Sequence, residues 1–144
     1  MSACVFCEIV AGNAPADRVY EDDEILAFLD IRPITRGHTL VIPKHHAPEL
    51  DDLDAELGTR LFRVGHRLAL AVRRSDLRAD GANLAINDGK AAFQTVAHTH
   101  LHVVPRRHGD KLRFAGGLIL RRSTEPEATA AAIRAGLERL EAER

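Results

Sequence analysis

AHTHLHVVP, residues 97–105, places three histidines at alternate positions. In a β-strand alternate side chains share one face, so His98, His100 and His102 would stand in a row about 7 Å apart. The apolar residues between and after them would point into a core on the opposite face, and they favour a strand. In a helix the three rings would fan around the axis. Three titratable rings on one face indicate chemistry rather than a histidine-rich surface strand.

The composition is that of an ordinary globular protein with one sizeable core. The chain has 144 residues, of which 45% are hydrophobic and 28% charged, and its net charge is −1. We therefore expect a single domain over residues 1–144, with no general attraction to nucleic acid or to an anionic membrane. No apolar run approaches the roughly 20 residues of a membrane span, and the first residues lack the pattern of a signal peptide. We expect a cytoplasmic protein.

Apolar periodicity along the chain predicts an α+β fold with antiparallel strands. A stripe of leucines and valines at steps of three and four predicts one long amphipathic helix, which begins after Asp54 and ends near residues 74–76. The pair Gly116-Gly117 is expected to interrupt any element there. The remaining predicted helices are a short one over 4–12 and a C-terminal one over 126–140. The predicted strands cover 19–21, 25–30, 39–43, 82–87 and 97–105.

The triad and its flanks resemble the signature of the histidine triad (HIT) family, and within it the small bacterial nucleotide-binding members. The flanks are Asp30-Ile31-Arg32-Pro33, Gly37–Lys44, Asn87-Asp88-Gly89 and Gln94–Ala97. The resemblance runs from about residue 4 to about 107, whereas the tail 108–144 is interpreted from its pattern alone. It implies a HIT-like fold: a five-stranded antiparallel sheet with one long and one short helix, followed here by a C-terminal helix. It also implies a homodimer.

Imidazole suits nucleotidyl transfer because much of it is unprotonated near neutral pH. Attack on phosphorus would give a covalent phosphohistidine that water then cleaves, so that one hard step becomes two easier ones. The resemblance assigns the nucleophile to His100 and a hydrogen bond to the phosphate or bridging atom to His102. It makes His98 a support of the array or a metal ligand. It places Gln94 and Thr95 at the phosphate and the leaving group.

The resemblance also implies a nucleotide pocket. Asp30 matches the acid that binds the ribose hydroxyls, and Asn87 matches a contact on the phosphate side. The matching apolar base pocket consists of Phe6, Ile9, Phe28 and Ile31, although each of these could equally be plain core. At Phe93 this chain departs from the glycine that commonly precedes the glutamine, so the side chain would narrow the leaving-group side.

The spacing Cys4-Val-Phe-Cys7 is that of a zinc site, and equally that of a redox pair. The resemblance completes a structural zinc site with a histidine after the third strand and the first histidine of the triad. The predicted ligands are therefore Cys4, Cys7, His46 and His98, with His45 as the competitor of His46. The alternative is a reduced pair without metal. The other histidines, His38, His66 and His108, are interpreted as ordinary, with His38 bonded inside its turn.

The function expected from the resemblance is a purine nucleotide-binding hydrolase or transferase. It would act on nucleoside phosphoramidates or related nucleotidyl conjugates through a nucleotidyl-histidine, with no organic cofactor. Two alternatives remain: a hydrolase of diadenosine polyphosphates, and a nucleotide-binding interaction module with weak catalysis.

Overall fold

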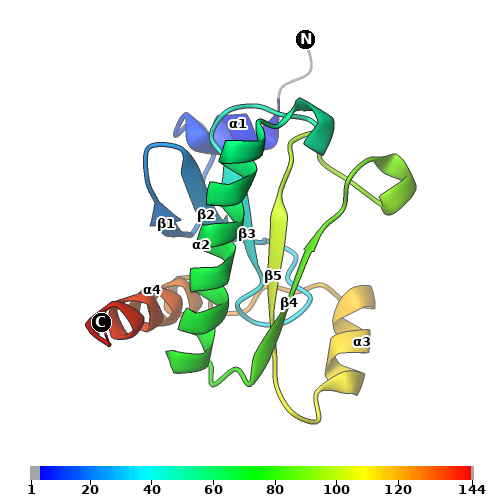
Figure 1. The fold of residues 1–144 in the computed structure, drawn as a ribbon. Helices are drawn as coiled ribbons and strands as arrows, with labels where there is room; N and C mark the ends of the chain where they lie inside the picture. Colours follow the sequence, from blue (N-terminus) through cyan, green and yellow to red (C-terminus); the bar gives the residue numbers. More distant parts are fainter. Residues whose placement is uncertain (1–3, 144) are drawn as a thin grey trace.

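A computed structural model describes residues 4–143 and shows a five-stranded antiparallel sheet (Figure 1). The strand order is β1-β2-β3-β5-β4, and every neighbouring pair is antiparallel. The predicted α+β fold is confirmed, and the predicted strand bounds differ by a residue or less except at the triad. The strands are β1 (Arg18–Glu21), β2 (Ile25–Leu29), β3 (Thr39–Pro43), β4 (Gly81–Ile86) and β5 (Leu101–Arg106).

The long helix α2 (Ala55–Arg74) covers one face of the sheet. Its N-cap Asp54 accepts a hydrogen bond from the backbone N–H of Leu57, which satisfies one of the free donors of the first turn. The apolar stripe predicted for this helix is buried against strand residues that include Val41 and Val103. The buried stripe consists of Leu57, Leu61, Val64, Leu68 and Val72.

The opposite face carries the short helix α1 (Val5–Val10) and the triad. Phe6 and Ile9 of α1 pack on a second apolar cluster, formed by Leu26, Phe28, Leu40 and Ile42. Side chains alternate along β5, so its apolar residues reach the core under α2 while His102 lies on the α1 side. The face that carries the histidines, predicted from the alternation in the sequence, is therefore the one opposite α2.

Strand β5 begins at Leu101, four residues later than predicted, so His98 and His100 precede the strand. In this lead-in the backbone bonds to a loop instead of a neighbouring strand: the N–H of Thr99 donates to the carbonyl of Ala47 at 2.7 Å. The rings of His100 and His102 are consequently 4.9 Å apart between centroids, closer than a regular strand would place them. The rings of the triad are therefore not spaced as in a regular strand.

The tail contains a helix that the sequence did not predict. Helix α3 (Lys111–Ile119) runs through Gly116 and Gly117, so the expected break at this pair is wrong. Gly117 has a packing role, because a Cβ there would collide with the backbone of Ile34. Helix α4 (Pro126–Ala142) follows with Pro126 at its start and packs across the lower end of α2 in Figure 1. None of the helices within 4–143 is long and apolar enough to cross a membrane. Two short 3-10 turns cover Leu50–Asp52 and Lys90–Ala92.

Gly117→Ala should therefore weaken the packing of α3 against Ile34, whereas Gly116→Ala should leave this packing unchanged. A methyl group at 117 meets the Ile34 backbone, while nothing lies within 4 Å of a Cβ built at 116. Alanine in an open helical position instead stabilises by about 1 kcal/mol relative to glycine. Amide hydrogen exchange over 111–119 should be faster in Gly117→Ala and unchanged or slower in Gly116→Ala. Equal exchange in the two variants would contradict this packing.

Candidate active site and metal centre

His100 is held in one tautomer by the main chain. Its Nδ1 lies 2.7 Å from the carbonyl oxygen of His98, and because a carbonyl only accepts, Nδ1 must carry the proton. The lone pair therefore resides on Nε2. The ring is buried, 4% exposed, and the edge of Phe6 packs against it with 5.2 Å between centroids. His100 thus has the arrangement of an oriented nucleophile.

His102 is oriented by a second chain of hydrogen bonds, which runs through His38. The backbone N–H of Ile34 donates to Nδ1 of His38 at 3.0 Å, so the proton of that neutral ring is on Nε2. Nε2 of His38 lies 2.9 Å from Nδ1 of His102 and donates to it. The proton of His102 is therefore on its own Nε2, a buried atom without a partner among residues 4–143.

His38 is the residue that sequence reasoning missed. Its bond inside its own turn exists, as expected, but the residue is fully buried and also contacts the triad. A signal was available: His38 is two residues before Leu40, which pairs with His102 in the sheet. Alternation from Leu40 would have put His38 on the triad face.

Burial keeps both rings of this pair neutral. It lowers the pKa of His38 to about 3, with further lowering by the charges of His102, Arg121 and His100. It lowers the pKa of His102 to about 4, helped by His100 and Arg121. Burial also raises the pKa of Asp30, against the backbone N–H of Arg32 that donates to Oδ1 at 2.8 Å. The other oxygen of Asp30 lies 3.7 Å from Nε2 of His38.

The residues expected to contact the nucleotide are distributed unevenly. Phe6, Ile9 and Phe28 are buried in the apolar cluster beneath α1, whereas Ile31 is 77% exposed. Asn87 is half-buried and Thr95 is exposed.

Gln94 ties the loop between β4 and β5 together. Its Nε2 donates to the carbonyls of Pro48 and Val96 at 2.6 and 2.9 Å, and its Oε1 accepts from the N–H of Gly89 at 2.7 Å. One amide proton is thus used within this loop, on Val96, and the other on Pro48 in the loop after β3. A contact with the leaving group stays a prediction, for which Oε1 retains one lone pair.

Phe93 takes the backbone conformation that a glycine would favour, with φ +67° and ψ +30°. Its side chain is 83% exposed, and the expected narrowing of the leaving-group side stays a prediction.

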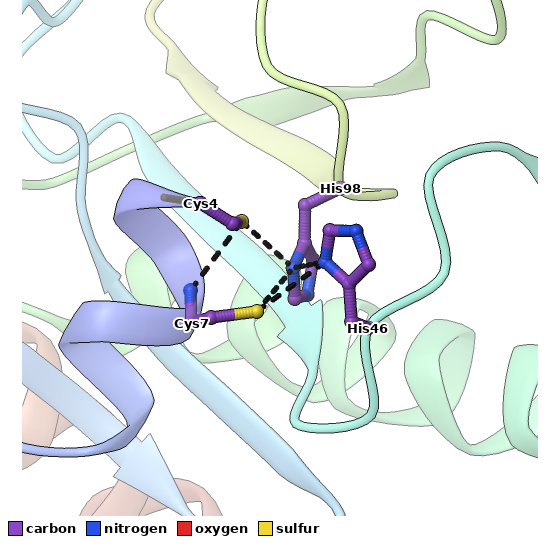
Figure 2. Close-up of side chains that lie close together, drawn as sticks. All are labelled: Cys4, Cys7, His46 and His98. Atoms are coloured by element: carbon purple, nitrogen blue, oxygen red, sulfur yellow. Dashed lines mark hydrogen bonds between the residues drawn. The ribbon is translucent and has the colours of Figure 1, made fainter. Parts of the chain in front are cut away.

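Four predicted metal ligands converge at the start of α1 (Figure 2). Cys4, the N-cap of α1, and Cys7 present their sulfurs at the same end of the helix. The atom Nδ1 of His98 lies 3.4 Å from Sγ of Cys4 and 3.6 Å from Sγ of Cys7. Nδ1 of His46 lies 3.3 Å from Sγ of Cys7 and 3.2 Å from Nδ1 of His98. His46, and not the competitor His45, belongs to this cluster.

The donor set fits a tetrahedral zinc ion. Zn–S bonds of about 2.3 Å and Zn–N bonds of about 2.0–2.1 Å would separate neighbouring ligand atoms by about 3.3–3.8 Å. The distances above match this spacing to within about 0.3 Å. The tautomer of His98 fits as well: its Nε2 lies 2.8 Å from the carbonyl of Pro43 and carries the proton, which leaves the lone pair on Nδ1.

The comparisons with known proteins show the family. Residues 11–109 match the family model described as the HIT domain, and the chain belongs to this family. The crystal structure of a Zn-bound histidine triad family protein from Mycobacterium smegmatis is 55% identical, with a TM-score of 0.91, over 99% of this chain and 98% of that one. An uncharacterized HIT-like protein of Mycobacterium tuberculosis is also 55% identical, over 93% of this chain and 92% of its own length.

Two more distant relatives have names that state an activity. An adenosine 5′-monophosphoramidase of Saccharomyces cerevisiae is 39% identical over 74% of this chain and 64% of its own length. An adenylylsulfatase of Arabidopsis thaliana is 38% identical over 76% of this chain and 55% of its own length. The family thus includes hydrolases that bind nucleotides.

Lowering the pH should destabilise the fold through His38 and His102. The native state keeps both rings neutral, whereas an unfolded histidine with a pKa near 6.5 takes up a proton. The free energy of unfolding should therefore fall as the pH falls from about 6.5 to 4, by up to about 1.4 kcal/mol per pH unit for each histidine. In urea unfolding measured at several pH values, the free energy of unfolding of His38→Gln should fall less steeply with falling pH than that of wild type. The exposed His66→Gln should keep the wild-type pH dependence. The same pH dependence in all three proteins would refute the assignment.

Proposed function

We propose that this protein is a purine nucleotide-binding hydrolase or transferase that acts on nucleoside phosphoramidates or related nucleotidyl conjugates. The observation that carries the proposal is the pair of fixed tautomers at the triad. His100 offers a lone pair on Nε2, and His102 offers a buried N–H without a partner. A nucleophile beside a free donor is what attack on an electrophilic phosphorus requires.

In the first step, Nε2 of His100 attacks the α-phosphorus, and the P–N bond of the phosphoramidate breaks. The amine leaves with a proton taken up from solvent, while the Nε2–H of His102 donates a hydrogen bond to the phosphate or the bridging nitrogen. The carbonyl of His98 accepts the Nδ1–H of His100 and so stabilises the positive charge that the ring gains on phosphorylation.

In the second step, water attacks the phosphorus and the bond between phosphorus and His100 breaks. The proton of this water is released to solvent, which balances the one taken up by the amine. The products are a nucleoside monophosphate and an amine, His100 returns to its starting tautomer, and His102 keeps its proton throughout. With an acceptor other than water, the same sequence is a nucleotidyl transfer.

The remaining contacts follow from the family resemblance. Asp30 would accept hydrogen bonds from the ribose hydroxyls, since a carboxylate accepts two such donors well. Asn87, Gln94 and Thr95 would surround the phosphate and the leaving group. The base would rest on the apolar residues Phe6, Ile9, Phe28 and Ile31.

The proposal includes a structural zinc ion held by Cys4, Cys7, His46 and His98. Its support is the ligand spacing together with the Zn-bound structure from Mycobacterium smegmatis. Bound there, zinc supplies a cross-link between α1, the loop after β3 and the lead-in to β5. His98 would then be fixed at its ring, which steadies the carbonyl that orients His100.

The proposal also includes a homodimer. Strand β4 lies at the edge of the sheet, where unpaired backbone groups favour a second strand. Helix α2 carries Phe62, 57% exposed, on the side away from the core. Such a strand and helix fit the edge-to-edge pairing that the family resemblance implies.

His100→Ala should abolish turnover of adenosine phosphoramidate while AMP still binds. The alanine removes the nucleophile and leaves Asp30 and the apolar residues in place. His102→Ala should reduce the rate less, by about 10²–10⁴-fold, as is typical for loss of general acid–base or electrostatic help. Rapid quenching of wild type with radiolabelled substrate should trap an acid-labile nucleotidyl adduct on His100.

The matched control is His66→Ala, which removes an exposed histidine and should leave turnover unchanged. Turnover of diadenosine tetraphosphate, measured in parallel, distinguishes a phosphoramidate hydrolase from a diadenosine polyphosphate hydrolase. If His100→Ala keeps more than about a hundredth of the wild-type rate, covalent catalysis by this residue is wrong.

The zinc site makes its own prediction. Protein purified without chelator should contain about one zinc per chain, and Cys7→Ser or His46→Gln should remove most of it. The melting temperature should fall with the metal, because zinc binding energy becomes folding energy. His45→Gln is the matched control and should retain zinc. Full zinc occupancy in His46→Gln, measured by mass spectrometry of metals, would overturn the ligand set.

A further inference from the structure

Arg121 lies in the connection between α3 and α4, outside residues 11–109 that match the family. Helix α3 is docked through Gly117, whose Cα approaches the backbone of Ile34 so closely that no side chain fits. Ile34 is the residue whose N–H holds His38 in its tautomer. The tail is therefore packed directly on the loop that positions the triad, and Arg121 follows only four residues after this contact.

Arg121 has a buried donor without an acceptor. Among residues 4–143, three buried side-chain nitrogen or oxygen atoms lack a partner, and Nε of Arg121 and Nε2 of His102 are two of them. Both atoms carry a hydrogen: a guanidinium is always protonated, and the bond from His38 puts the proton of His102 on Nε2. Buried donors are rarely left unpaired, so two of them indicate a ligand that accepts hydrogen bonds.

The charge of the guanidinium acts on three groups of the site. It contributes to the lowered pKa of His38 and of His102, and it opposes the rise that burial causes in the pKa of Asp30. Arg32, in the loop between β2 and β3, also opposes the rise at Asp30. Burial keeps His38 and His102 neutral, whereas the guanidinium of Arg121 stays positively charged.

We propose that Arg121 is a catalytic residue supplied by the tail: its guanidinium donates hydrogen bonds to the phosphoryl oxygens of the nucleotide held at His100 and His102. The inference rests on the proposed function and adds a residue to that site. Positive charge at these oxygens would stabilise the negative charge that grows on them as His100 attacks. Arginine suits this role because it stays protonated and can bind two oxygens at once.

The test compares Arg121→Gln with Arg122→Gln. Both remove one positive charge from the same connection, but Arg122 is exposed, whereas Arg121 is half-buried. We expect Arg121→Gln to lower kcat/KM for adenosine phosphoramidate by about 10²–10³-fold, as loss of one preorganised donor does elsewhere. Arg122→Gln should stay within about twofold of wild type.

Binding separates a phosphate contact from a structural role. Arg121→Gln should weaken AMP binding at least about tenfold and leave adenosine binding unchanged, because adenosine lacks the phosphate. Arg121→Lys keeps the charge and should recover part of kcat. Each variant is checked for wild-type circular dichroism and zinc content before it is compared.

Three results would overturn the inference. Equal weakening of AMP and adenosine binding in Arg121→Gln would make the residue structural. Unchanged AMP binding and turnover in Arg121→Gln, with an active wild type, would remove Arg121 from the site and leave the proposed function standing. If wild type itself bound neither AMP nor adenosine, the proposed function would fail together with this inference.

Discussion

The site depends on one short hydrogen bond, from Nδ1–H of His100 to the carbonyl of His98 at 2.7 Å. It decides which nitrogen of His100 keeps a lone pair, and therefore whether the ring can act as a nucleophile. The carbonyl is itself held in place: the ring of His98 donates to Pro43, and the next residue, Thr99, bonds through its N–H to Ala47. The loop after β3 thus orients a histidine that precedes β5.

A second relay orients the partner ring. It passes from the main chain at Ile34 through His38 to His102, across the β3–β5 pair. The orientation of each ring thus starts from a main-chain group: the carbonyl of His98 for His100, and the N–H of Ile34 for His102. A carbonyl can only accept and an amide N–H can only donate. The two Nδ1 atoms are therefore held in opposite roles: that of His100 donates to a carbonyl, and that of His102 accepts from His38.

Most of the secondary structure and the faces of its side chains can be predicted from local sequence pattern. Alternation over 97–105 placed the histidines on one face, and the stripe from Leu57 to Val72 predicted the helix that covers the other. These features are readable because a strand and a helix each impose a fixed period on side chains that must be buried. The cysteines at 4 and 7 and the two histidines at 46 and 98 could be selected through the family resemblance, and the fold brings them together.

Tertiary structure decided what periodicity cannot express. The late start of β5 follows from the bond between Thr99 and Ala47, a contact across 52 residues of chain. Helix α3 persists through two glycines because Gly117 gains a close contact with Ile34, which outweighs local propensity. The roles of His38 and Arg121 depend on partners far away in sequence. The periodicity of the sequence predicts on which face of a helix or strand a side chain lies. Which atoms it contacts there depends on residues that only the folded chain brings close.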